Sequence, residues 1–110
     1  MTTLRQWFTK FMLATGEVPE SVIFGEEEYS YVLDDWPPIP TGSVLGLDEV
    51  PDEVWDQEFD DWFGEIRSPN FCAWSKNYVV FSDDYDGAEG VCWLPRHPVV
   101  HVPTRPGGGG

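Results

Sequence analysis

The residues with the clearest potential for metal chemistry are two cysteines and two histidines in the last forty positions. They follow the spacing C-x19-C-x4-H-x3-H, and the four are Cys72, Cys92, His97 and His101. Thiolate and imidazole groups bind zinc, but structural zinc sites use a pair of cysteines a few residues apart, which this spacing lacks. Cys92 and His97 could also form a thiolate–imidazole pair, although no neighbouring feature marks Cys92 as exposed or activated. We therefore expect neither a zinc site nor a cysteine nucleophile, and we expect both histidines on an exposed edge.

A second candidate is the run Asp84–Gly87, which resembles part of a calcium-binding loop. If its glycine takes the sixth position of such a loop, Ser82 falls at the first ligand position and Trp93 at the twelfth. Neither can supply the carboxylate that the loop requires, so a turn built on Asp and Gly is the simpler interpretation. Carboxylates are also too abundant for any acid–base pair to stand out, and the chain has no Gly-rich phosphate loop. The sequence therefore predicts a protein that is not an enzyme and holds no cofactor.

The strongest signal is the distribution of charge. The chain has 20 acidic and 6 basic residues, a net charge of −14 and an isoelectric point near 4.1. From Phe11 to Ile66 there is no Lys or Arg, and this stretch carries sixteen carboxylates between Glu17 and Glu65. Acids without basic partners repel one another and destabilise the compact state, so folding alone does not explain them. Such a charge excludes a module that neutralises nucleic-acid phosphates, and it disfavours docking on an anionic membrane surface.

The acidic residues are expected to form a binding surface for a basic partner. A helix predicted from Pro51 to Phe63 would be about 20 Å long and carry roughly one carboxylate per 3.4 Å, close to the phosphate spacing along one DNA strand. Two more acidic patches, 26–28 and the loop of 83–86 with Glu89, could extend this surface. Trp36 stands before two prolines and is predicted to be the most exposed tryptophan, at the rim of the surface. The predicted partner-binding residues are Glu26, Glu27, Glu28, Trp36, Glu53, Asp56, Asp60, Asp61, Asp83, Asp84 and Asp86.

A helix near the N-terminus is the clearest predicted element. Its apolar residues recur at helical spacing, and they are Leu4, Trp7, Phe8, Phe11 and Met12. Thr3 and Gln6 fit a capping box, and Gly16 can end the helix in a left-handed conformation. The apolar stripe is expected to pack on a sheet, and the alternative is that it binds a partner.

The remaining chain is predicted to contain short strands. The expected strands are 21–24, 71–75, 78–83 and 91–94, with Lys76-Asn77 as a two-residue turn and 84–90 as a longer one. Residues 29–33 fit a helix or a strand, and Val99, Val100 and Val102 could pair briefly. This order of elements predicts an α+β fold: a small single domain with two helices packed on an antiparallel sheet of three or four strands.

Length and composition predict one domain that works in the cytoplasm. A chain of 110 residues can bury one core, expected over residues 1–103, with 104–110 as a flexible Gly-rich tail. No apolar run approaches the roughly 18 residues of a membrane span, and the N-terminus lacks the pattern of a signal peptide. Cys72 and Cys92 are too few for a disulfide scaffold, and they could lie close only if their strands were neighbours.

The small size, the acidity of 17–65, the six tryptophans and the lack of catalytic motifs resemble a broad class of phage anti-defence proteins. That class includes anti-CRISPR and anti-restriction proteins, some of which mimic DNA. The segment from Tyr78 to Pro98 is also similar to phage-borne sequences. The resemblance implies a non-catalytic inhibitor that fills the nucleic-acid-binding groove of a bacterial defence complex, with carboxylates in place of phosphates. It assigns no binding residue by motif.

Three other hypotheses stay open on the sequence. An immunity protein that caps the basic active site of a toxin nuclease would have the same charge, and gene neighbourhood would separate the two. A calcium- or metal-dependent accessory protein would use Asp83, Asp84 and Asp86, and calorimetry with calcium and magnesium would detect it. A generic acidic protein would carry these charges for solubility alone. The sequence predicts no direct contact with nucleic acid or a membrane, and it predicts no oligomeric state.

Overall fold

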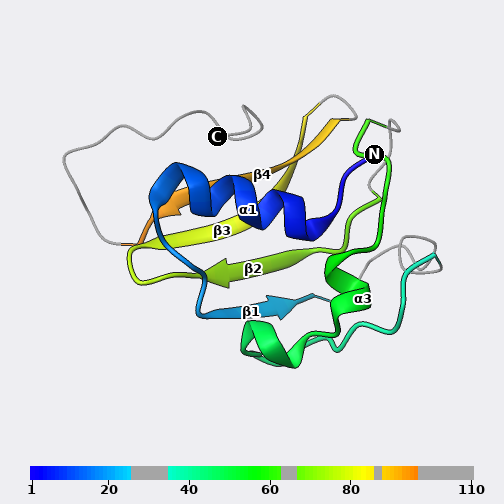
Figure 1. The fold of residues 1–110 in the computed structure, drawn as a ribbon, viewed down its shortest axis with the longest axis horizontal. Coiled ribbons are helices and arrows are strands. Elements are labelled where there is room, and N and C mark those ends of the chain that lie inside the picture. The colour runs from blue at the N-terminus through cyan, green and yellow to red at the C-terminus, as the bar shows by residue number, and fades with distance from the viewer. Residues whose placement is uncertain (26–34, 63–66, 86–87, 97–110) are drawn as a thin grey trace.

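The computed structural model describes residues 1–25, 35–62, 67–85 and 88–96. These residues form the elements α1 (Leu4–Thr15), β1 (Ser21–Phe24), the 3₁₀ helix η1 (Leu47–Glu49), α3 (Asp52–Trp55), β2 (Phe71–Trp74), β3 (Tyr78–Tyr85) and β4 (Ala88–Pro95). The strands make one antiparallel sheet in the order β1-β2-β3-β4, and α1 lies across one face of it (Figure 1). The predicted α+β fold, with two helices on a sheet of three or four antiparallel strands, is confirmed.

The predicted signals at both ends of α1 are confirmed. The Thr3 hydroxyl accepts a hydrogen bond from the Gln6 N–H at 3.1 Å, and the Gln6 side chain accepts one from the Thr3 N–H at the same distance. This capping box satisfies two backbone donors of the first turn. Gly16 ends the helix with a φ of 74°, and its N–H donates to the Met12 carbonyl at 2.8 Å. A residue with a Cβ would be strained in that conformation.

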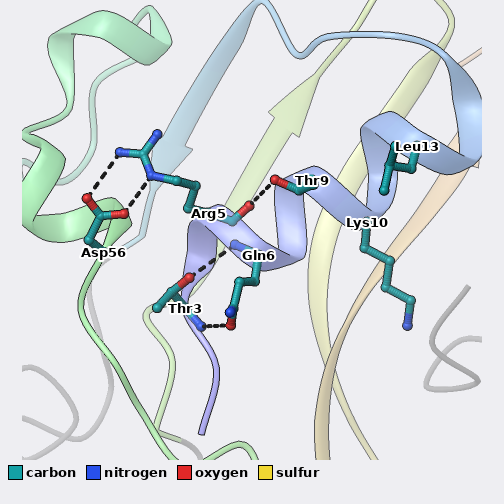
Figure 2. A pocket seen from close by; sticks show the side chains of 7 residues that line it. All are labelled: Thr3, Arg5, Gln6, Thr9, Lys10, Leu13 and Asp56. Carbon is teal, nitrogen blue, oxygen red and sulfur yellow. Dashed lines mark hydrogen bonds and ion pairs between the residues drawn. The ribbon is translucent and has the colours of Figure 1, made fainter.

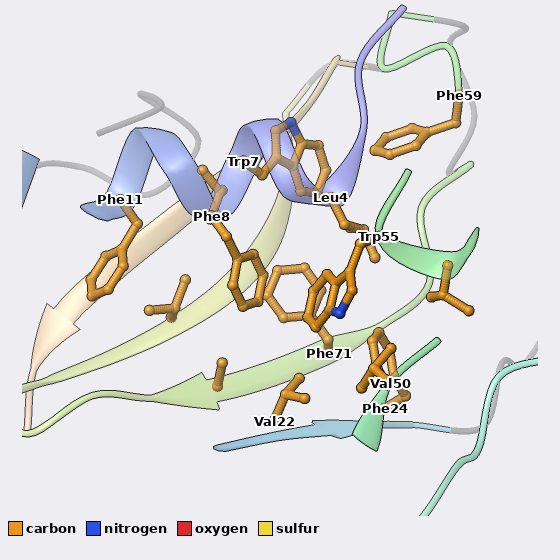
Figure 3. Packing of buried hydrophobic residues seen from close by; sticks show 14 of the residues in the cluster. Leu4, Trp7, Phe8, Phe11, Val22, Phe24, Val50, Trp55, Phe59 and Phe71 are labelled. Atoms are coloured by element: carbon orange, nitrogen blue, oxygen red, sulfur yellow. The ribbon is translucent and has the colours of Figure 1, made fainter. Parts of the chain in front are cut away.

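The apolar stripe of α1 packs on the sheet rather than facing a partner. Leu4 and Phe11 are fully buried, and the Phe8 ring lies 5.4 Å from Phe71 on β2. Figure 3 shows Phe8 and Phe11 pointing from α1 towards the sheet. Phe11 also meets Trp93 of β4 edge-on at 5.6 Å, so α1 contacts both a middle and an outer strand. Burying each such side chain contributes roughly 1.5–3 kcal/mol, and these contacts make α1 part of the core.

The two hairpins of the sheet differ in how well the sequence predicted them. The two-residue turn at Lys76-Asn77 is confirmed, because the Ser75 N–H donates to the Tyr78 carbonyl at 3.0 Å. The longer turn predicted over 84–90 is wrong, since β3 and β4 pair as far as Tyr85 and Ala88. Only Asp86-Gly87 separates these paired positions in the chain, and an Asp-Gly pair between strands is a strong hairpin signal.

The outer edge of β1 is covered by the chain itself. Val22 and Leu45 exchange two backbone hydrogen bonds of 2.8 Å each, and the Gly42 N–H donates to the Phe24 carbonyl at 2.8 Å. Residues 42–45 therefore lie along β1 in the place of a further strand.

The helix predicted from Pro51 to Phe63 is wrong for residues 56–62, since α3 ends at Trp55, and Phe63 lies outside the described residues. Phe59 instead forms an antiparallel bridge with Thr2, in which each N–H donates to the other's carbonyl at 2.9 Å. Its ring packs edge-on against Trp7 at 5.1 Å. These tertiary contacts override a segment whose aspartates are weak helix formers and would have lain near the negative end of the helix dipole.

The register of the sheet shows how far apart the two cysteines lie. Cys72 on β2 and Cys92 on β4 both pair with Phe81 of β3, so their strands are not neighbours. Two strand spacings, about 10 Å, separate the two cysteines, which is too far for a disulfide.

The predictions for 26–34, 63–66, 86–87 and 97–110, including the tail at 104–110, lie outside the described residues. None of the helices in the described part has the length and apolarity needed to cross a bilayer.

Candidate functional site

The most acidic described region is the segment 47–62, here called the acidic strap. It begins at η1, passes through α3 and runs up one end of the sheet towards the N-terminus (Figure 1). Its apolar side chains hold it against the core, and the four most buried are Val50, Val54, Trp55 and Phe59. Because those side chains point inwards, the carboxylates between them face solvent. The carboxylates of the strap are Asp48, Glu49, Asp52, Glu53, Asp56, Glu58, Asp60 and the half-buried Asp61.

One cation from α1 reaches the strap. The Arg5 Nε donates to Asp56 at 2.6 Å, and its terminal nitrogen lies 3.4 Å from Asp52. The hydrogen bond to Asp56 raises the pKa of the Arg5 guanidinium above its ordinary value. Asp52 and Asp56 therefore have a basic partner, although the stretch from Phe11 to Ile66 contains no Lys or Arg of its own. The folded chain brings together charges that lie about fifty positions apart in the sequence.

The strap ends beside the β3–β4 hairpin. The Glu89 N–H donates to the Asp61 carbonyl at 2.8 Å, and Glu89 pairs with Asp84 across the hairpin. Asp84 is exposed and Asp83 is half-buried. Figure 1 shows this end of the hairpin next to the end of the strap. The structure thus brings two of the predicted acidic patches together, while the third, 26–28, and Asp86 lie outside the described residues.

Glu89 does not belong to the exposed acidic loop in which the sequence placed it. It is 9% exposed, and its carboxylate accepts hydrogen bonds from the backbone N–H groups of Arg67 and Ser68, at 2.9 and 3.0 Å. The Ser68 hydroxyl donates a third at 2.5 Å. Glu89 therefore fastens the chain before β2 to the β3–β4 hairpin, and it is a structural residue.

Glu17 has a similar structural role at the opposite end of the sheet. Its carboxylate accepts hydrogen bonds from the Ser75 hydroxyl at 2.6 Å and from the backbone and side-chain nitrogens of Asn77, at 3.0 and 2.8 Å. These bonds, above all the one from Ser75, lower the pKa of the Glu17 carboxyl. Hydrogen bonds to a carboxylate favour its charged form, so Glu17 holds the β2–β3 turn as an anion.

The prediction of Trp36 as the most exposed tryptophan is wrong. Trp36 is 9% exposed, its indole N–H donates to the Arg67 carbonyl at 3.0 Å, and its ring lies 5.4 Å from Phe59. A polar partner and an aromatic neighbour hold it inside. Trp62 is 78% exposed instead, and its backbone N–H donates to the Asp60 carboxylate at 3.0 Å. In a helix from Pro51 to Phe63, Trp62 would share an apolar face with Trp55 and Phe59, but α3 ends at Trp55.

The described part of the chain has hollows on both sides of Arg5 along α1, which the sequence did not predict. The larger, about 540 Å³, is shallow and lies on the outward face of the helix, beside the Arg5–Asp56 ion pair (Figure 2). Its lining residues are Thr3, Arg5, Gln6, Thr9, Lys10, Leu13 and Asp56. Leu13 is 83% exposed there, off the apolar stripe that predicted the helix. The smaller, about 230 Å³, lies between α1 and the strap and is here called the strap pocket.

Residues with potential for metal or nucleophilic chemistry do not converge in the described part of the chain. No three Cys, His, Asp or Glu side chains there are arranged to hold a metal ion. Burial raises the pKa of the Cys72 thiol, which disfavours the reactive thiolate. His97, His101 and Asp86 lie outside the described residues. Comparison with protein families, curated proteins and solved structures finds no match to this chain.

Proposed function

We propose that this protein is a non-catalytic inhibitor whose acidic strap occupies the basic nucleic-acid-binding surface of a bacterial defence complex, in the cytoplasm. The observation that carries the proposal is the orientation of the strap. Its apolar residues anchor it to the core, and its carboxylates point to solvent along one end of the molecule. Folding therefore leaves this charge available to a partner.

The charge of the strap is suited to capturing a basic surface. In the described part of the chain only Asp52 and Asp56, of its eight carboxylates, contact a cation. A concentrated field of one sign speeds the encounter with a surface of opposite sign, and salt weakens that attraction. Because α3 is only one turn long, the proposal rests on this potential and not on regular, phosphate-like spacing.

Trp62 would anchor such an interface. It stands at the end of the strap with 78% of its surface exposed, next to Asp60 and Asp61. Exposed tryptophans often dominate the energy of an interface once a partner covers them. An indole ring beside carboxylates also suits arginine, which can stack on the ring while it pairs with the acid.

A charge reversal with a matched control tests the proposal. The variant Glu53→Lys/Glu58→Lys reverses two exposed carboxylates of the strap that make no ion pair in the described residues. The control, Ala14→Lys/Val18→Lys/Glu20→Lys, adds the same charge at exposed positions around the other end of α1. The measurement is affinity capture from a bacterial lysate that expresses defence systems, washed first at low and then at high salt.

We expect the wild type and the control to recover a nucleic-acid-binding complex at low salt and to lose it at high salt. The strap variant should recover at least tenfold less, since like charges facing each other across an interface cost several kcal/mol. Trp62→Ala should also reduce recovery. Equal recovery by the strap variant and the control would contradict the proposal. Capture of a toxin nuclease would keep the strap as the contact surface but replace the defence complex with the immunity target.

A further inference from the structure

We infer that the strap pocket receives the side chain of a single arginine from the partner, which makes it the specific contact within an otherwise diffuse acidic surface. The inference rests on the proposed function, because it names the chemistry that the strap recognises. The pocket lies where α1 faces η1 and α3. Its volume of about 230 Å³ is below the range of small-molecule sites, so one extended side chain is the occupant that fits.

The walls of the strap pocket divide into an apolar and a charged part. The apolar part comes from both sides, with Phe8 and Met12 on α1 and Leu47 and Trp55 on the strap. Met12 and Leu47 are partly exposed, so they offer surface to the methylene stem of a long side chain. Methionine is unbranched and adapts to the shape of an incoming group.

The charged part of the pocket favours a cation. Asp48 and Asp52 stand at its rim, and Asp48 makes no ion pair in the described residues. Among the described residues, Arg5 is the only cation that lines the pocket, and its 2.6 Å contact with Asp56 offsets its charge. Asp56 balances the charge of Arg5, so Asp48 and Asp52 leave the rim of the pocket with a net negative charge.

The protein itself contains a precedent for this recognition. The Arg5 guanidinium bridges Asp52 and Asp56, two carboxylates one turn apart on the strap. Asp48 on η1 and Asp52 at the start of α3 both line the pocket. A second guanidinium in the pocket would have these two carboxylates as its partners. Arginine fits better than lysine, because its planar group can pair with a carboxylate through two hydrogen bonds and stack on aromatic side chains.

The test uses a capped arginine amide as the probe and the capped amide of citrulline, its neutral analogue of the same shape, as the control ligand. Both are titrated into the full chain, with NMR signals of the methionine methyl groups and the Trp55 indole as the readout. Met1 is 77% exposed and lines neither hollow, so its methyl group reports non-specific effects. Asp48→Asn removes the rim charge, and Glu58→Gln removes an exposed strap charge outside the pocket.

We expect arginine to shift the Met12 and Trp55 signals along a saturating curve, while Met1 stays unchanged and citrulline shifts none of them. Asp48→Asn should weaken the arginine affinity roughly five- to tenfold, and Glu58→Gln should leave it within about twofold. Equal losses in the two variants, or equal binding of citrulline, would overturn the inference. The probe needs no partner, so this result stands apart from the capture experiment. If strap reversal abolishes capture but arginine leaves Met12 unmoved, the proposed function survives and the pocket inference fails.

Discussion

Two regions of this protein use the same chemical group in opposite ways. At the ends of the sheet, Glu17 and Glu89 each accept three hydrogen bonds and tie together segments that are distant in the sequence. Along the acidic strap, carboxylates face solvent, and in the described part of the chain only Asp52 and Asp56 contact a cation. Among the described residues, Glu17 and Glu89 therefore join separate segments of the fold, whereas most carboxylates of the strap remain as surface charge.

The largest effect that distinguishes the two regions is expected at Glu89. Glu89→Ala would leave the N–H groups of Arg67 and Ser68 without their acceptor, and bonds to a charged acceptor contribute about 1.5–3 kcal/mol. We expect the free energy of unfolding to fall by about that amount in urea titrations followed by tryptophan fluorescence. Glu58→Ala, at an exposed strap position, should change it by less than about 0.5 kcal/mol. Similar losses in both variants would show that the two regions do not differ in this way.

A smaller effect is expected from the pH dependence of Glu17. Its folded pKa lies below the usual value of 4.5, so its contribution to stability is complete above that value and is lost as pH falls through the folded pKa. The stability of the wild type should therefore fall more steeply below about pH 4.5 than that of Glu17→Gln. Thermal unfolding between pH 3 and 7 measures this, and parallel profiles would contradict the assignment.

The smallest effect is expected at the boundary between the two regions, where Arg5 meets the strap. The pair is half exposed on both sides, so solvent screens it, and exposed pairs contribute about 0.2–1 kcal/mol. Arg5→Ala should lower stability by no more than this, and 0.5 M salt should remove most of the difference. A loss above about 2 kcal/mol would place Asp56 with the structural acids instead.

The sequence was a good guide wherever local signals agreed with the tertiary fold. In α1 the capping box at Thr3, the apolar stripe and Gly16 all specify the same helix, and each of them is observed. The strands of the sheet were predicted for the same reason, since short aromatic and β-branched runs alternate with turn residues. Local and global preferences pointed the same way in these elements.

The prediction failed on the strap because contacts distant in the sequence decided its shape. The apolar spacing after Pro51 suited a longer helix, but the bridge from Thr2 to Phe59 fixes an extended backbone there. No local pattern contains that pairing. Distant contacts also decided which tryptophan is exposed. Trp36 is buried because its indole N–H donates to the Arg67 carbonyl, whereas Trp62 lies in solvent. The two hollows beside α1 likewise depend on which segments meet it.

The covered edge of β1 determines where another molecule could extend the sheet. The backbone N–H and carbonyl of Val22 already bond to Leu45, so a strand of another molecule cannot pair with that edge. Pairing along the β4 edge is also obstructed, because the Glu89 N–H already donates to the Asp61 carbonyl and Pro95 has no N–H. Such interruptions are a known protection against the growth of sheets into fibrils. Even at high concentration, stacking of copies edge to edge should therefore be disfavoured.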